Sequence, residues 1–261
     1  MLLRICSALV LIPIFFSCIW FLGPVPLLLV AEAVLVLAFI EYARLAAALG
    51  ARLSSVVSGA AAAAVCAAVA LDLPLDLPLA AALVAIGSVA VGARVPGKGV
   101  LNDVAAAAFP MLYLGLPLGC FVALHASAGR KAVLLLLLTV IVSDSGQYFA
   151  GRLFGRHKLS PVISPKKTLE GAVGGFVLAP VVLAWLGRWW LPQISTERLL
   201  LFGVAIVGLG IAGDLFESLL KRSAGIKDSS TLIPGHGGVL DRIDALLFTV
   251  PAFHVFLKYS L

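Results

Sequence analysis

The sequence of residues 218–244 reads SLLKRSAGIKDSSTLIPGHGGVLDRID. It places three acids, four bases and a Gly-His-Gly-Gly turn between two apolar segments, in a chain where only 12% of the residues are charged. Soluble domains typically contain about 25% charged residues. The hydrophobic fraction of 62% and the mean hydropathy of +1.12 therefore predict an integral membrane protein that concentrates its charge in a few segments.

Apolar runs long enough to cross a bilayer recur along the chain. A transmembrane helix needs about 20 mainly apolar residues. We predict an all-α, polytopic membrane protein with about nine such helices. The candidate spans are 5–22, 25–42, 55–71, 78–93, 104–124, 132–150, 171–187, 199–219 and 244–258.

The distribution of basic residues predicts the orientation. With the N-terminus inside, 14 of the 19 Lys and Arg residues fall in cytoplasmic segments. Because such residues concentrate in cytoplasmic loops, the N-in, C-out orientation is favoured. The same rule explains the net charge of +6, so that this charge does not indicate binding to nucleic acid. We expect a multi-pass protein of the cell inner (plasma) membrane whose working face is cytoplasmic.

Polar residues divide the chain unevenly. Residues 1–131 contain few of them and are interpreted as transmembrane scaffold helices. Residues 132–261 contain most of them and are interpreted as the catalytic region, with cytoplasmic loops at 151–170 and 220–243. Ionisable side chains are costly in a bilayer and usually mark function there. The second half is therefore where we expect the site.

Acidic residues cluster at three predicted helix ends. Asp214, Ser218 and Lys221 are spaced so that one face of a helix presents all of them. Asp144 lies near the end of the sixth predicted span, and Asp241 and Asp244 lie at the start of the last one. Carboxylates at this density suit Mg²⁺, which prefers oxygen ligands and is typically held by one or two carboxylates plus substrate phosphates. Alternatively, these acids form ion pairs at the membrane surface with Lys221, Arg222 and Arg242.

Basic and glycine-rich segments supply the complementary chemistry. The stretch Ser164-Pro-Lys-Lys-Thr168 combines two lysines with two hydroxyls that can bind phosphate oxygens. Residues 235–238 are Gly-His-Gly-Gly, directly before a predicted helix. Glycines let backbone N–H groups approach a phosphate, and a helix start favours an anion. Both segments indicate phosphate binding.

Four blocks together resemble the phosphatidate cytidylyltransferases, also called CDP-diacylglycerol synthases. The blocks are residues 143–152, 164–171, 213–218 and 218–244, so that the resemblance covers about residues 143–258. It implies an all-helical membrane protein, often a dimer. It also implies an enzyme that joins CTP and phosphatidic acid into CDP-diacylglycerol and pyrophosphate with Mg²⁺.

The resemblance also assigns roles to residues. Asp214 and Asp241 match the family's metal-binding aspartates, and Lys221 matches the lysine of its Lys-Arg pair. We expect Lys221, Asp214, Asp241 and Asp144 to be catalytic, and Asp214, Asp241 and Asp244 to hold the metal. The expected substrate-binding residues are Ser164, Lys166, Lys167, Thr168, Ser218, Arg222, Lys227, Asp228, His236, Gly237, Gly238 and Arg242.

Two other functions fit parts of the pattern. An ion-coupled transporter also places acids within spans, but here the acids lie toward one end of the spans and no inverted repeat is apparent. A CTP-dependent polyprenol or lipid kinase would use a hydroxyl nucleophile, and that nucleophile would need a base. Dependence on nucleotide separates the transporter from the enzymes, and the lipid substrate separates the kinase.

Overall fold

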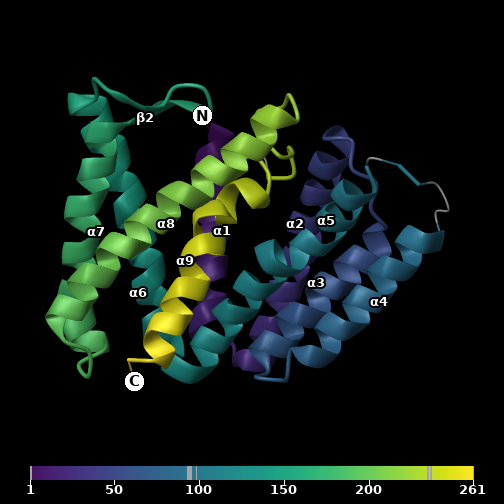
Figure 1. Cartoon of the computed structure of the whole chain (residues 1–261). Coiled ribbons are helices and arrows are strands. Elements are labelled where there is room, and N and C mark those ends of the chain that lie inside the picture. Colours follow the sequence, from purple (N-terminus) through teal and green to yellow (C-terminus); the bar gives the residue numbers. More distant parts are fainter. Residues whose placement is uncertain (1, 93–95, 98, 234, 236, 261) are drawn as a thin grey trace. The chain divides into compact units, whose positions relative to one another are not determined.

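The computed structural model describes residues 2–92, 96–97, 99–233, 235 and 237–260. Helices dominate these residues, and one short hairpin interrupts them (Figure 1). The elements are α1 (Leu2–Phe21), α2 (Pro24–Ala48), α3 (Ser55–Ala70), α4 (Asp76–Gly92), α5 (Val100–Pro110), the π-helical turn η1 (Met111–Gly115), α6 (Leu116–Phe154), β1 (Lys158–Ser160), β2 (Ser164–Thr168), α7 (Leu169–Trp190), α8 (Thr196–Ser223) and α9 (Leu240–Lys258).

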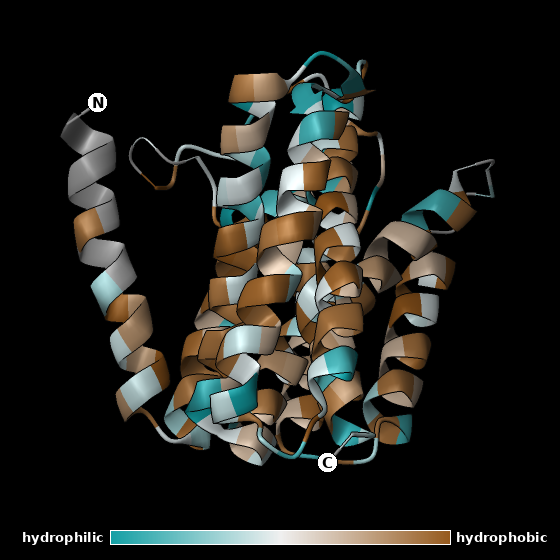
Figure 2. Ribbon diagram, turned by 90° about the vertical axis from the view of Figure 1, so that its left-hand side faces the viewer, coloured by the Kyte–Doolittle hydropathy of each residue, from teal (hydrophilic) through white to brown (hydrophobic). Residues whose placement is uncertain are grey.

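Four of the described helical segments are long and apolar enough to cross a membrane. They are Pro24–Ala48, Val100–Phe154, Leu169–Trp190 and Thr196–Ser223, while α3 and α4 are shorter apolar helices. Figure 2 shows hydrophobic colours along most of the helical ribbon, with hydrophilic residues near helix ends and connections. The helical, membrane-type character is confirmed. Nine spans and the N-in, C-out orientation remain predictions.

Gly129 divides the longest helical segment. Its φ of 80° and ψ of 170° are not helical, so that α6 consists of two helices joined at this residue. A residue with a Cβ rarely adopts a positive φ, and glycine does so readily. The predicted spans 104–124 and 132–150 lie on either side of this break. The chain also divides close to it into two compact units, residues 1–126 with 220–243 and residues 127–219 with 244–261.

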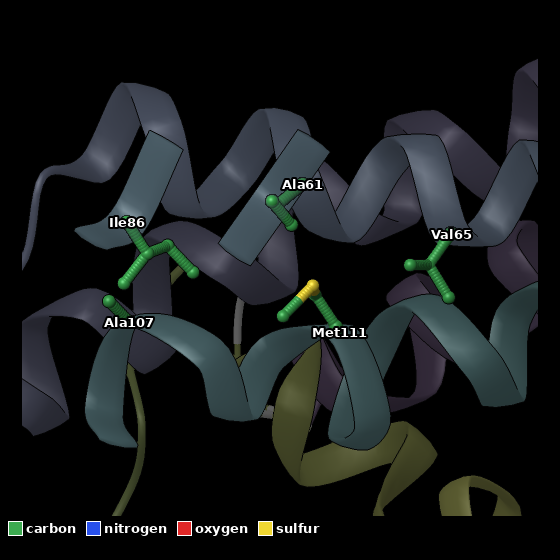
Figure 3. Close-up of a cluster of buried hydrophobic side chains, with 6 residues drawn as sticks. Ala61, Val65, Ile86, Ala107 and Met111 are labelled. Carbon is green, nitrogen blue, oxygen red and sulfur yellow. The ribbon is translucent and has the colours of Figure 1, made fainter. Parts of the chain in front are cut away.

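The first unit is built around α3. This helix packs against α2, α4, α5 and η1, and α3 and α4 lie side by side in Figure 1. Figure 3 shows Ala61 and Val65 of α3 facing Ile86 of α4, Ala107 of α5 and Met111 of η1. These small and medium-sized side chains allow close helix packing, as is common in membrane proteins.

The second unit is built from close helix contacts at glycines. Gly146 of α6 and Gly174 of α7 face each other, and a Cβ on Gly174 would lie 2.6 Å from the Gly146 carbonyl oxygen. Gly203 of α8 approaches Pro180 of α7 in the same way, and Gly213 of α8 approaches the Asp244 carbonyl of α9. Small residues at such contacts allow helix backbones to approach closely.

A two-stranded hairpin occupies most of the predicted loop 151–170. Strands β1 and β2 are antiparallel, with Lys158 opposite Thr168 and Ser160 opposite Ser164. The all-α prediction is therefore corrected to a nearly all-α fold. Thr168 then caps α7, because its hydroxyl accepts a hydrogen bond of 3.1 Å from the Gly171 amide. The hairpin and this cap together fix the position of Lys166 and Lys167 relative to the start of α7.

Candidate functional site

Asp214 and Lys167 form the centre of a polar cluster in the second unit. Lys167 Nζ, at the end of β2, lies 2.6 Å from Asp214 Oδ2 on α8. Ser218 lies one turn further along α8 and donates a 3.3 Å hydrogen bond to Asp214 Oδ1. This contact confirms that Asp214 and Ser218 share a helix face. We name these residues, together with Asp144, the Asp214 cluster.

Asp144 completes the Asp214 cluster from α6. Its carboxylate interacts electrostatically with both Asp214 and Lys167. Gln147, one turn later on α6, donates to Ser143 Oγ at 3.1 Å and lies 3.5 Å from Asp144 Oδ1. Two carboxylates near each other repel, and a cation between or beside them stabilises both. Lys167 supplies one positive charge to this pair.

Glu170 anchors the segment that leads into the hairpin containing Lys167. Glu170, in the first turn of α7, accepts hydrogen bonds from the amides of Arg156 and His157 at 3.0 and 3.2 Å. His157 Nδ1 also lies 2.6 Å from the same carboxylate. Lys167 is half-buried, whereas Lys166 is exposed. Of these two neighbouring lysines, Lys167 is the one that forms the ion pair with Asp214.

A second cluster lies in the first unit and is centred on Asp241. Lys221 Nζ, near the end of α8, lies 2.5 Å from Asp241 Oδ1 at the start of α9. Both side chains are largely buried, with 11% and 5% of their surfaces exposed. Asp241 Oδ2 accepts hydrogen bonds from the Ser229 amide (3.0 Å), the Ser229 hydroxyl (2.9 Å) and the Gly238 amide (2.8 Å). Asp241 thus connects Ser229 and Gly238 to Lys221 of α8.

Glu41 is the second acid of this cluster, and its role was not predicted from the sequence. Glu41 of α2 is 2% exposed and accepts hydrogen bonds from the hydroxyls of Ser229 and Ser230 at 3.0 and 2.6 Å. It also accepts from the amides of Val239 and Leu240 at 3.0 and 2.8 Å. An acid within an apolar run was the available signal, but nothing in the sequence identifies partners about 190 residues away. We name Glu41, Lys221, Ser229, Ser230, Gly238 and Asp241 the Asp241 cluster.

Gly238 is enclosed by this cluster. A Cβ on Gly238 would lie 2.5 and 2.6 Å from the two carboxylate oxygens of Glu41, and it would also collide with the Ser229 hydroxyl. The Gly238 amide was predicted to hold a phosphate, and in the structure it donates a hydrogen bond to Asp241. Gly237 has a φ of 83° and lies against the same aspartate. The phosphate-binding role of both glycines stays a prediction.

The remaining predicted residues lie on the segments that carry the two clusters. Asp244 Oδ1 accepts from the Ala245 amide at 2.8 Å, and Arg222 donates to the Ile226 carbonyl at 3.3 Å. Ser164 is partly buried, and His236 lies outside the described residues. The exposed members of the predicted set are Lys166, Arg222, Lys227, Asp228 and Arg242.

The Asp214 cluster offers the better fit to Mg²⁺. Among the described residues, no group of three or more His, Cys, Asp or Glu side chains is arranged to hold a metal ion. Mg²⁺ commonly needs only one or two protein carboxylates when substrate phosphates complete its shell, and Asp144 with Asp214 meets that requirement. Asp241 already contacts donors through both oxygens, so that a metal there would have to replace Lys221 or one of the other donors.

Comparisons with known proteins place the chain in a family. Residues 2–260 match the model of the "Cytidylyltransferase family". A Helicobacter pylori protein named "Phosphatidate cytidylyltransferase" is 41% identical over 155 residues, which cover 59% of this chain and 57% of that protein. Proteins of the same name from Thermotoga maritima and Haemophilus influenzae are 40% and 44% identical over 165 and 138 residues. These matches cover 61% and 51% of this chain, and 61% and 48% of those proteins.

The aligned region thus spans about half to three fifths of the length of these relatives. The match to the family model, by contrast, runs from residue 2 to residue 260, through α1 as well as α9. On this match, the chain belongs to the cytidylyltransferase family.

Proposed function

We propose that this protein is a phosphatidate cytidylyltransferase, which transfers the cytidylyl group of CTP to phosphatidic acid. The observation that carries the proposal is the match of nearly the whole chain to the family, in a protein whose two polar clusters each pair an aspartate with a lysine. Relatives at about 40% identity are named for this activity. The pairs supply the charges that phosphate chemistry requires.

The proposed reaction needs little covalent help from the protein. A phosphate oxygen of the lipid attacks the α-phosphorus of CTP, and the bond from that phosphorus to the bridging oxygen of the β-phosphate breaks. CDP-diacylglycerol and pyrophosphate result. The nucleophile is already an anion near neutral pH, so that neither a serine or cysteine nucleophile nor a general base is required. Catalysis then depends on positioning and on stabilising negative charge.

Each cluster has a role in this proposal. In each cluster, the lysine exchanges part of its contact with aspartate for a phosphate oxygen of a substrate and so stabilises negative charge. Asp214, with Asp144, would hold Mg²⁺, which when bound neutralises phosphate charge and polarises the α-phosphorus. The roles of Asp241 and Asp244 as further metal ligands belong to the same proposal.

The location of the substrates supports a site at the membrane surface. Phosphatidic acid lies in a leaflet with its head group at the interface, and CTP is water-soluble. The apolar helices with charged residues near their ends suit both substrates. We further propose that the protein is a multi-pass protein of the inner membrane, with the site on the cytoplasmic side, and that it acts as a homodimer.

Release of pyrophosphate tests the proposed activity. Purified protein in detergent receives CTP, Mg²⁺ and phosphatidic acid, and each component is omitted in turn. We expect release only when all three are present, together with a CDP-lipid detectable by mass spectrometry. Folded protein that releases no pyrophosphate with the complete mixture would contradict the proposal. Turnover with a polyprenol in place of phosphatidic acid would indicate a lipid kinase instead.

A further inference from the structure

The proposed chemistry assigns no role to Glu41, a buried acid of the first unit. It lies near the end of α2, a helix otherwise rich in Leu, Val and Ala. A buried carboxylate is expensive unless hydrogen bonds compensate for its lost hydration. Among the described residues, four donors contact Glu41, two at each oxygen, and all four come from residues 229–240.

Two of these donors are amides at the start of α9. Val239 and Leu240 lie where the first N–H groups of a helix lack partners within the helix. Such groups are usually satisfied by a capping side chain close in sequence, and an anion there also interacts favourably with the helix dipole. Gly238 and Val239 have no side chain that can cap. Glu41 supplies the cap from a different helix.

The other two donors connect Glu41 to the ion pair. The Ser229 hydroxyl lies 3.0 Å from Glu41 Oε2 and 2.9 Å from Asp241 Oδ2. A hydroxyl has one hydrogen to donate, so that the two carboxylates share it. Asp241 in turn holds Lys221. A continuous path of hydrogen bonds therefore runs from Glu41 through Ser229 and Asp241 to Lys221.

The geometry points to Glu41 as a positioning residue for the proposed cytidylyl transfer. It holds Ser229, Ser230 and the start of α9 in place and thereby sets the orientation of the Asp241–Lys221 pair. This inference rests on the proposed function for its catalytic part. Its structural part concerns only the loop at residues 229–240 and can be measured without substrate. The steric fit of Gly238 against Glu41 supports it, because this contact leaves no space for another side chain.

Variants of Glu41 separate positioning from simple stability. In Glu41→Gln, an NH₂ group replaces one oxygen and faces two donors, while the shape is almost unchanged. We expect kcat to fall about 10- to 100-fold, because the hydrogen bonds that orient the loop weaken when the charge of Glu41 is removed. The KM for CTP should change little, since Glu41 contacts no substrate in this account. Glu41→Asp keeps the charge and should recover part of kcat.

Glu32→Gln is the matched control. Glu32 lies on the same helix but nine residues earlier, and it interacts with Cys66 rather than with the loop. This variant should keep the wild-type kcat. A folded Glu41→Gln protein with wild-type kcat, or a loss equal in Glu41→Gln and Glu41→Asp, would overturn the positioning role.

Hydrogen–deuterium exchange gives a readout that does not depend on activity. In detergent, Glu41→Gln should speed amide exchange in peptides that cover 229–240 and leave peptides from α3 and α4 unchanged. Unchanged exchange in 229–240 would overturn the inference. If the wild type releases no pyrophosphate, the proposed function fails, but the exchange result still decides whether Glu41 holds the loop. If Glu41→Gln fails to fold, Glu41→Asp is compared with the wild type in both experiments, and a wild-type kcat with unchanged exchange in 229–240 would overturn the inference.

Discussion

Lys221 and Asp241 form an ion pair of 2.5 Å across a loop that joins two helices. Both side chains are almost buried, so that water contributes little to their stabilisation. The alternative interpretation of the sequence, in which the acids pair with neighbouring bases, is therefore correct for Asp241. This pairing does not exclude a catalytic role, because a lysine can exchange part of its contact with an aspartate for a phosphate oxygen.

Asp241→Asn should impair both stability and activity. The substitution removes the Asp241 charge from its ion pair with the buried Lys221, and breaking a buried pair typically costs about 3–5 kcal/mol. We expect a lower thermal unfolding temperature in detergent, together with loss of pyrophosphate release. The double variant Lys221→Met/Asp241→Asn should recover much of the stability and none of the activity. A double variant less stable than Asp241→Asn would contradict this explanation.

Asp214→Asn should impair activity alone. The Asp214 side chain is 39% exposed and its partner Lys167 is 20% exposed. The pair is thus in part accessible to water, and ion pairs at the surface contribute only about 0–1 kcal/mol to stability. We expect turnover to fall at least about 100-fold, because even a supporting group of a metal site is typically worth about 10- to 100-fold. Thermal unfolding should stay near that of the wild type. Normal turnover in this variant would remove Asp214 from the site.

The two neighbouring lysines of the hairpin should differ. Lys167 contacts Asp214, whereas Lys166 is exposed. We expect Lys167→Ala to reduce kcat about 100-fold, in the range found when a group that stabilises developing charge is removed. Lys166→Ala should cause a smaller change, seen mainly in the KM for CTP. Equal effects on kcat would mean that the hairpin presents both lysines to the substrate.

Gly238→Ala should destabilise the loop. The added methyl group would overlap the Glu41 carboxylate and the Ser229 hydroxyl, and such overpacking typically costs about 1–3 kcal/mol. The control is Gly208→Ala within α8, where the nearest atom to a Cβ lies 4.0 Å away. Since alanine favours a helix over glycine by about 1 kcal/mol, this control should be neutral or stabilising. Thermal unfolding of both variants in detergent measures the difference.

Local patterns made the helices and one helix face predictable. Apolar runs gave the approximate positions of the helices, because burial in lipid requires continuous hydrophobic segments. The four-residue spacing of Asp214 and Ser218 placed them on one face, and their hydrogen bond confirms it. These inferences need only the geometry of a single helix.

The features that escaped prediction depend on distant parts of the chain. Glu41 gave no sign of its role, because its partners are 188 to 199 residues away. The hairpin at 158–168 lacks the alternation of apolar and polar residues that marks a strand. Its strands are short, and the second strand runs directly into the capped start of α7.

Labelled CTP shows which of its phosphorus atoms the protein transfers to lipid. Purified protein is given phosphatidic acid, Mg²⁺ and CTP labelled at either the α- or the γ-phosphate, and the lipid and aqueous fractions are counted separately. Cytidylyl transfer predicts that the α-label enters the lipid and that the γ-label leaves as pyrophosphate. The γ-label in the lipid, with CDP in the aqueous fraction, would contradict the account and identify a lipid kinase.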